Sequence, residues 1–194
     1  MSPASCAGKR AKILLRGGAG DLGTRLQGPG ARLGEVFAFM SSLYFRGKLA
    51  YATQFGAPPQ GWPGALVITP GRGLCAWDLL ITVDDLRAMA TVDVDHENPA
   101  FVTPLARDAQ ALAGVLDSNG QVVLLGSVAT DKYVAPLLQV FGDRLLFPSA
   151  FVGRGDMSRG GLLLRSAEAG TPLDYAPVRG ANRHGPRPPR LARK

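Results

Sequence analysis

The sequence contains little cysteine and little histidine, with two residues of each among 194. Cys6 and Cys75 cannot build a disulfide framework, so we expect two free thiols in a reducing cytoplasm. Paired cysteines and histidines are absent, which argues against structural zinc, and no cofactor is expected. No apolar run approaches the ~20 residues of a membrane helix, and residues 1–12 lack an apolar signal segment. The expected protein is therefore cytoplasmic, without a membrane partner.

Acidic residues are missing from one end of the chain. The net charge is +7, from 22 basic and 15 acidic residues, yet residues 179–194 hold five arginines, one lysine and no acid. Residues 1–178 therefore carry 16 basic against 15 acidic side chains and are nearly neutral. We expect residues 179–194 to be a disordered basic tail. Two interpretations stay open: a solvated end, or a segment that contacts nucleic-acid phosphates without reading sequence.

The length fits one domain with a core of its own. We expect residues 1–11 to be a flexible N-terminus and residues 12–178 to form a single α/β domain. Apolar runs without polar alternation suit strands buried on both faces. Four such runs are predicted as strands: Lys12–Leu15, Ala65–Thr69, Val122–Leu125 and Arg144–Phe147. Leu162–Arg165 and Leu173–Val178 could add edge strands.

Helical patterns lie between these runs. Apolar residues from Leu33 to Tyr51 follow helical spacing, with an interruption expected at Gly47. Thr82–Asp85 resembles a capping box, and Asn98 followed by Pro99 is a typical helix start. Thr130–Gly142 also favours a helix, which either starts at Pro136 or kinks there. Alternating strands and helices predict an α/β fold, a three-layer sandwich with a mainly parallel central sheet.

Glycine, arginine and a hydroxyl or carboxylate recur in the four loops that follow predicted strands: Gly17–Asp21, Pro70–Gly73, Gly126–Asp131 and Pro148–Gly161. In a parallel sheet these loops meet at one edge, where ligands bind. Glycine amides and arginine side chains favour phosphate or carboxylate. The candidate catalytic residues are Asp21, Ser127 and Asp156. The candidate ligand-binding residues are Gly71, Arg72, Gly73, Gly126, Thr130, Lys132, Arg154, Ser158 and Arg159.

An acidic cluster precedes the helix start at Asn98. It consists of Asp93, Asp95, His96 and Glu97, whose side chains are types that bind cations. Their spacing matches no ligand pattern, and a solvated acidic loop before the helix start at Asn98 is the favoured interpretation. We assign no metal site, and the sequence does not decide whether this cluster binds a metal.

Three segments carry a family resemblance: LYFRGKLAYA at 43–52, ALVITPGRGL at 65–74 and VVLLGSVATDKYVAPLL at 122–138. They resemble small uncharacterised bacterial α/β proteins that are distantly similar to uracil-DNA-glycosylase-like domains. The resemblance covers about half of the chain. It implies an α/β fold and a nucleotide-like ligand. The glycosylase catalytic motifs have no match, so base excision is not implied.

Two functions remain open from the sequence. The first is binding of a phosphorylated or nucleotide-like ligand at the strand carboxyl ends, held by Arg72, Arg154 and Arg159, with or without catalysis. The alternative is a non-catalytic binding module whose basic tail contacts nucleic acid. The substrate, the oligomeric state and the presence of any reaction are not determined by the sequence.

Overall fold

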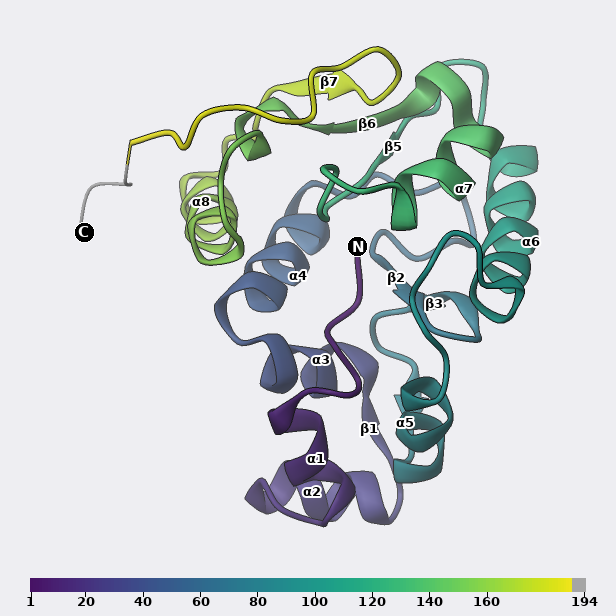
Figure 1. Cartoon of the computed structure of the whole chain (residues 1–194), viewed down its shortest axis with the longest axis vertical. Helices are drawn as coiled ribbons and strands as arrows, with labels where there is room; N and C mark the ends of the chain where they lie inside the picture. Colours follow the sequence, from purple (N-terminus) through teal and green to yellow (C-terminus); the bar gives the residue numbers. More distant parts are fainter. Residues whose placement is uncertain (190–194) are drawn as a thin grey trace.

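The computed structural model describes residues 1–189 and is dominated by helices (Figure 1). Within these residues the α-helices are α1 (Lys9–Leu15), α2 (Gly20–Gln27), α3 (Leu33–Ser41), α4 (Leu43–Phe55), α5 (Val83–Ala90), α6 (Pro99–Val115), α7 (Asp131–Phe141) and α8 (Asp156–Ala169). Short 3-10 turns, η1 (Gly142–Arg144) and η2 (Ser149–Phe151), flank one strand. The strands are β1 (Ala31–Arg32), β2 (Leu66–Thr69), β3 (Gly73–Ala76), β4 (Leu80–Ile81), β5 (Val122–Val123), β6 (Leu145–Pro148) and β7 (Tyr175–Pro177).

The predicted three-layer sandwich with a mainly parallel central sheet is wrong. The described strands form three small sheets, in which β1 pairs with β4 and β2 pairs with β3, both antiparallel. In the third sheet β5 runs parallel to β6, and β7 lies antiparallel on the other side of β6. The three-stranded sheet lies at one end of the molecule and α1 with α2 at the other (Figure 1).

Two local features explain this correction. The run Lys12–Leu15 belongs to helix α1, because Ala11 and Leu14, three residues apart, share the buried face while Ile13 is exposed. Strand β2 returns directly into β3 through a tight turn. Its Thr69 carbonyl accepts a hydrogen bond from the Arg72 amide, Pro70 follows Thr69, and Gly71 has a φ of 74°. Proline followed by a positive-φ glycine is typical of a type II turn.

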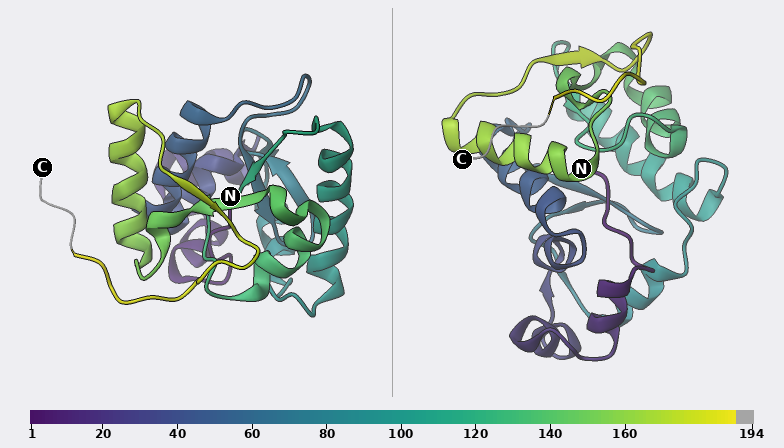
Figure 2. Two further views of the ribbon diagram at one scale, coloured as in Figure 1. Left: turned by 90° about the horizontal axis from the view of Figure 1, so that it is seen from above. Right: turned by 60° about the vertical axis from the view of Figure 1, so that its left-hand side comes forward.

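The helix predicted from Leu33 onward is divided at Ser42, which has a φ of 50°, and not at Gly47. Gly47 lies inside α4, where it faces Gly160 of α8 without room for a side chain. The predicted loop Pro148–Gly161 becomes helical from Asp156, and the possible edge strand Leu162–Arg165 is also part of helix α8. Small residues therefore serve helix packing here, and α8 lies along α4 (Figure 2).

Two other helix predictions are met, and a third is met only in that a helix forms. Thr82 caps α5, with its side chain accepting from the Asp85 amide and the Asp85 carboxylate accepting from the Thr82 amide. Asn98 caps α6, which has Pro99 in its first turn. Helix α7 starts at Asp131 and continues through Pro136, so the proline does not mark its beginning.

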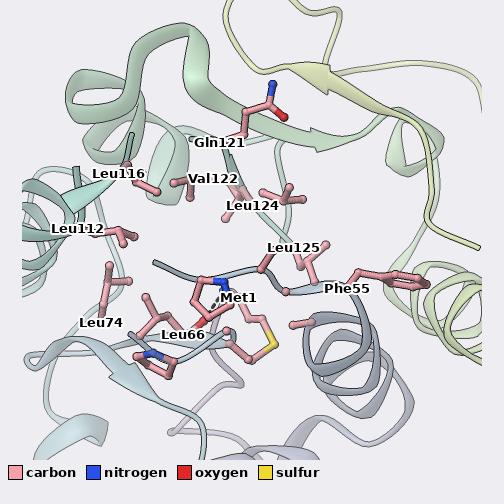
Figure 3. Close-up of a pocket in the computed structure, with 18 of the residues that line it drawn as sticks. Met1, Phe55, Leu66, Leu74, Leu112, Leu116, Gln121, Val122, Leu124 and Leu125 are labelled. Carbon is pink, nitrogen blue, oxygen red and sulfur yellow. Dashed lines mark hydrogen bonds between the residues drawn. The ribbon is translucent and has the colours of Figure 1, made fainter. Parts of the chain in front are cut away.

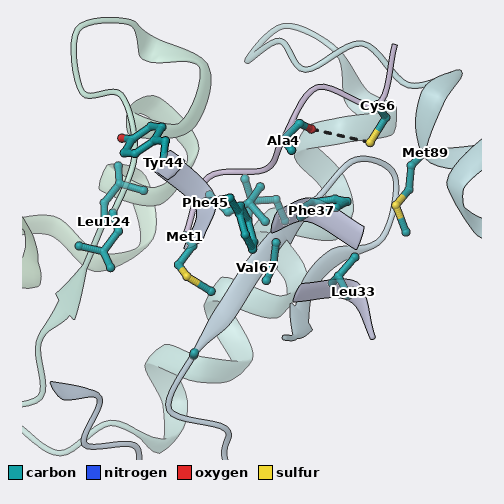
Figure 4. Close-up of a cluster of buried hydrophobic side chains, with 14 of the residues drawn as sticks. Met1, Ala4, Cys6, Leu33, Phe37, Tyr44, Phe45, Val67, Met89 and Leu124 are labelled. Atoms are coloured by element: carbon teal, nitrogen blue, oxygen red, sulfur yellow. Dashed lines mark hydrogen bonds between the residues drawn. The ribbon is translucent and has the colours of Figure 1, made fainter. Parts of the chain in front are cut away.

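The first two residues of the chain connect two of the sheets. The Met1 nitrogen donates to the Leu66 carbonyl of β2, at 2.6 Å, and the Ile68 amide donates to the Met1 carbonyl, at 2.9 Å. On the other side, the Ser2 amide donates to the Leu125 carbonyl, just beyond β5, at 3.0 Å. Met1 packs among the buried side chains of Phe45, Val67 and Leu124 (Figure 4). An extended segment thus lies between β2 and the end of β5.

Candidate functional site

The four glycine loops do not all meet. Asp21 lies in the first turn of α2, exposed and bonded to Arg25 at 2.9 Å. Arg72 turns toward α5 and pairs with Asp85 at 2.5 Å. Gly73 is enclosed by Asp108 and the Pro104 carbonyl, which leave no space for a Cβ. Asp21 and Arg72 are therefore engaged in pairs of their own.

The loop before α7 lies beside the N-terminal segment. Gly126 is buried, and a Cβ added to it would stand 2.8 Å from the Ser2 Cβ. Ser127 is half-buried. Thr130 is the N-cap residue of α7 but makes no capping hydrogen bond with its side chain, and Lys132 is exposed in the first turn. The first amides of α7 therefore lack a capping side chain, which leaves them suited to a polar or anionic group.

The start of α8 is held by two arginines that bond to the main chain. Arg154 donates from Nε to the Ala150 carbonyl and from Nη1 to the Ser158 hydroxyl. Arg159 is buried and donates from Nε and Nη2 to the Phe151 carbonyl, at 3.2 and 3.1 Å. Its Nη1 lies 3.6 Å from the exposed Asp156 carboxylate. Much of the hydrogen-bonding capacity of both guanidinium groups is thus used in fixing this loop.

Tyr44 of α4 was not singled out from the sequence, yet it has an unusual position. Its ring is 5% exposed, and its hydroxyl is the buried side-chain atom without a hydrogen-bond partner among residues 1–189. Figure 4 shows this hydroxyl directed away from Phe45 and Phe37. Burial raises the pKa of Tyr44, and Arg159, Asp156 and Tyr133 are near enough to act on it electrostatically. A buried hydroxyl normally has a partner, and Arg159 is near enough to provide one.

A polar hollow of about 930 Å³ lies next to the start of α7. Tyr133 and Lys132 form part of its wall, and burial raises the pKa of Tyr133 to about 12. The rest of the wall comes from three segments, residues 3–7, Pro70 and residues 89–98. Tyr133 also lies close enough to Asp156 for electrostatic interaction. Of the four predicted loops, only Pro70–Gly73 contributes to the lining, through Pro70, while Lys132 and Tyr133 follow directly after Gly126–Asp131. The convergence of the four loops on one pocket is therefore not seen.

The acidic cluster forms one wall of the polar hollow. Asp95 accepts a hydrogen bond from the Glu97 amide, and the His96 ring nitrogen lies 3.3 Å from the same carboxylate. Asn98 donates to the Asp93 carbonyl while capping α6. Within residues 1–189 no group of three or more metal-binding side chains is placed to hold an ion. The hydrogen bonds of these residues are local ones that hold the loop before the N-terminus of α6.

A buried lysine is the second feature that sequence reasoning missed. Lys48 is 1% exposed and donates to the Ser2 carbonyl and hydroxyl oxygens, at 2.7 and 3.0 Å. Its ammonium lies over the rings of Tyr44 and Phe45, at 4.4 and 4.9 Å from their centres. Burial lowers the pKa of Lys48 to about 7. Lys48 thus connects the N-terminal segment to α4. The sequence signal that could have indicated its burial is its position among the aromatic residues of this helix.

An apolar slot of about 390 Å³ lies between β2 and β5, and Met1 is one of the residues that line it (Figure 3). Leu66, Leu74, Leu112, Leu116 and Val122 contribute apolar wall, and Gln121 and Asn119 bring amide groups. A further polar feature is the pair of hydroxyls of Tyr51 and Tyr175, 2.5 Å apart. Among the described residues, the slot and the polar hollow share no lining residue.

Both cysteines are free, and Cys6 is buried, which raises the pKa of its thiol to about 11. Across residues 1–189, no helix combines the length and the apolar character needed to cross a membrane. Comparisons with protein-family models, curated proteins and solved structures find no match to the chain.

Proposed function

We propose that the protein binds a nucleotide-like ligand in the polar hollow. The observation that carries this proposal is the placement of Tyr133 and Lys132 at the uncapped start of α7, both in the wall of a hollow of about 930 Å³. That volume is in the range of small-molecule sites. An aromatic ring offers a stacking face to a base, and a lysine beside free helix amides offers a phosphate site.

The charges of the wall set the orientation of the ligand. Asp93, Asp95 and Glu97 would repel a phosphate, whereas their oxygens accept hydrogen bonds from ribose hydroxyls and from base amino groups. Within residues 1–189, Lys132 is the one basic side chain in the same wall. We therefore place the phosphate at Lys132 and the start of α7, and the sugar and base toward the acidic wall.

Catalysis, if the ligand is also a substrate, would use Asp156 as acid or base, because this carboxylate lies beside Arg159 and near Tyr133. Ser127 would be a hydrogen-bond donor in the loop before α7. Asp21 has no part in this site, because it is paired with Arg25 in α2. The cytoplasm remains the compartment we propose, on the basis of the sequence.

The test is a calorimetric titration with a nucleoside monophosphate, the corresponding nucleoside and inorganic phosphate. Lys132→Ala should weaken nucleotide binding by about 10- to 100-fold, the loss of one charge-assisted contact, and leave nucleoside binding nearly unchanged. Tyr133→Leu should weaken both. Lys12→Ala, an exposed lysine of α1, is the matched control. Equal affinities in the wild type, Lys132→Ala and Lys12→Ala would overturn the proposal.

A second role concerns the basic tail. Arg179 and Arg183 lie against Asp143 and Asp131, at 3.3 and 2.8 Å, and the pairs are solvent-accessible. Exposed pairs exchange readily for other anions, so these arginines could contact nucleic-acid phosphates. Residues 190–194 of the tail lie outside the described residues. Salt-sensitive binding of nucleic acid that disappears from a chain ending at Val178 would support this role, and binding unaffected by the truncation would exclude it.

A further inference from the structure

The basic tail reaches the rim of the polar hollow through Arg183. Its Nη1 donates to the Asp131 carboxylate at 2.8 Å, and Asp131 is the first residue of α7, directly before Lys132. Asp131 also lies near enough to His96, in the acidic cluster on the other side, for electrostatic interaction. The Arg183 guanidinium group is not part of the lining, but it bonds to the neighbour of the lysine to which we assign the phosphate.

The tail segment that carries this arginine is anchored on both sides. Before it, Ala181 packs against the hydrophobic core. After it, the Pro186 carbonyl lies so close to Gly153 that a Cβ has no room there. The Pro189 carbonyl accepts a hydrogen bond from Arg154 Nη1, at 3.4 Å. The tail therefore runs from the start of α7 to the loop before α8, which holds the arginine at the rim.

Most of the hydrogen-bonding capacity of Arg183 is unused. A guanidinium group presents five N–H donors in a planar fork that matches the oxygens of a phosphate. In the part of the chain that the structure describes, the side chain makes one hydrogen bond, from Nη1 to Asp131. The Asp131 side chain is 53% exposed, and an exposed ion pair is easily exchanged for another anion. A phosphate can thus take over this arginine without disturbing buried structure.

The charge of a phosphate group decides how many cations it needs. A phosphate monoester carries about −1.5 to −2 charges at pH 7, whereas a phosphodiester carries one. Lys132 supplies one positive charge in the wall of the hollow, which balances a diester and leaves a monoester only partly neutralised. Arg183 supplies a second positive charge from the tail, provided that the phosphate replaces Asp131 as its partner.

We propose that Arg183 is a specificity-determining residue of the polar hollow, which exchanges Asp131 for the ligand phosphate and so selects nucleotides with an unesterified terminal phosphate over phosphodiesters. In the free protein the Asp131 carboxylate occupies Nη1. In the complex Lys132 and Arg183 hold the phosphate together, one from α7 and the other from the tail. This inference rests on the proposed function, because it assigns a second cation to the same phosphate.

The experiment is a calorimetric titration of the full chain. The monophosphates of the common ribonucleosides are titrated first, and the tightest is compared with its phosphate methyl ester, which keeps the base and sugar but carries one charge. The wild type should bind the monophosphate at least ~10-fold more tightly than the methyl ester, the effect of one charge-assisted contact. Arg183→Gln should abolish this preference by weakening the monophosphate. Its nearly unchanged affinity for the methyl ester would show that the hollow is intact.

Arg179→Gln is the matched control. Arg179 belongs to the same tail and pairs with Asp143, at 3.3 Å, just beyond the opposite end of α7. Its replacement should leave the preference for the monophosphate as it is in the wild type. Equal losses in Arg179→Gln and Arg183→Gln would reveal a general effect of tail charge and overturn the assignment of Arg183.

The inference and the proposed function fail in different ways. If Lys132→Ala weakens binding of the monophosphate while Arg183→Gln keeps the preference over the methyl ester, the hollow binds the nucleotide without the tail, and the inference alone is wrong. If no monophosphate binds to the wild type, both are wrong.

Discussion

Gly47 and Gly160 face each other where α4 packs on α8, and a Cβ on Gly47 would stand 2.5 Å from the Gly160 carbonyl oxygen. The reverse substitution meets the main chain of Leu43 and Tyr44, with distances of 2.8–2.9 Å. The approach of the two helices therefore depends on the absence of side chains at both positions. It also brings Arg159, which precedes Gly160 in the chain, close to Tyr44.

Gly47→Ala should destabilise the protein by about 1–3 kcal/mol, the usual cost of overpacking. The methyl group meets main chain on α8, which cannot rotate away. Gly114→Ala is the control, because Gly114 lies near the end of α6 with nothing within 4 Å of an added Cβ. There alanine should gain up to about 1 kcal/mol through helix propensity. Denaturant unfolding measures both, and a neutral Gly47→Ala would contradict the tight crossing.

Tyr44→Phe should stabilise the protein. Removing a buried hydroxyl without a partner relieves a penalty of about 1–3 kcal/mol. Thermal melting of the wild type and the variant without ligand measures the effect. A variant that is less stable than the wild type without ligand would show that the hydroxyl has a structural partner in solution.

Lys48→Met should remove a pH dependence of stability. Burial lowers the pKa of Lys48 to about 7 from an ordinary 10.5, so above pH 7 the unfolded chain binds a proton that the folded protein does not. Stability of the wild type should therefore rise with pH from about 7 upward. Melting temperatures between pH 7 and 8, where free thiols with a pKa of about 8.5 are mostly protonated, measure the slope. The variant should lose this part of it, and equal slopes would contradict a buried, largely neutral amine.

Thr82→Ala should cost about 1 kcal/mol, because it removes the side-chain half of the capping box of α5. Thr53→Ala is the comparison: its hydroxyl bonds to carbonyls within α4 at the surface, and such substitutions change stability by about 0.5 kcal/mol or less. Equal unfolding free energies for the two variants would mean that the cap contributes nothing.

A chain ending at Val178 should melt within a few degrees of the full chain. Val178 is buried and is kept. The truncation removes the ion pairs of Arg179 and Arg183, together with the packing of residues 185–186 beside Val152 and Gly153. Exposed pairs contribute little to stability. A decrease of more than about 10 °C would show that the tail is part of the folded core.

Local elements were predictable where a side chain itself forms the local bond. The Thr82 and Asn98 caps are examples, since each bonds to an amide two or three residues away. The sheet was not predictable in the same way. An apolar run such as Ala65–Thr69 is equally compatible with a parallel neighbouring strand and with a hairpin. In the structure the tight turn at Pro70–Arg72 returns the chain, so the run forms a hairpin with β3. Periodicity also cannot separate a short strand from a helix such as α1.

The candidate site was partly predictable. Of the candidate catalytic and ligand-binding residues, Lys132 lines the polar hollow, together with Asp93, Asp95 and Glu97 of the acidic cluster. Tyr44 and Lys48 were not predicted as site residues. On a helix rich in aromatic residues, the ordinary interpretation of Tyr44 is a core side chain and that of Lys48 is a solvent-exposed charge. Their importance depends on contacts with Ser2 and with the start of α8, which are remote in the sequence. Pairwise contacts of this kind leave no local pattern.

The bonds of Met1 and Ser2 also constrain how the chain folds during synthesis. Ser2 leaves the ribosome early, whereas Leu125, to which its amide bonds, emerges roughly 6 to 25 s later at about 5–20 residues per second. Until then α4 and the β2–β3 hairpin can form without the final main-chain bond. Ser2 must therefore remain unpaired on this side until Leu125 has been synthesised.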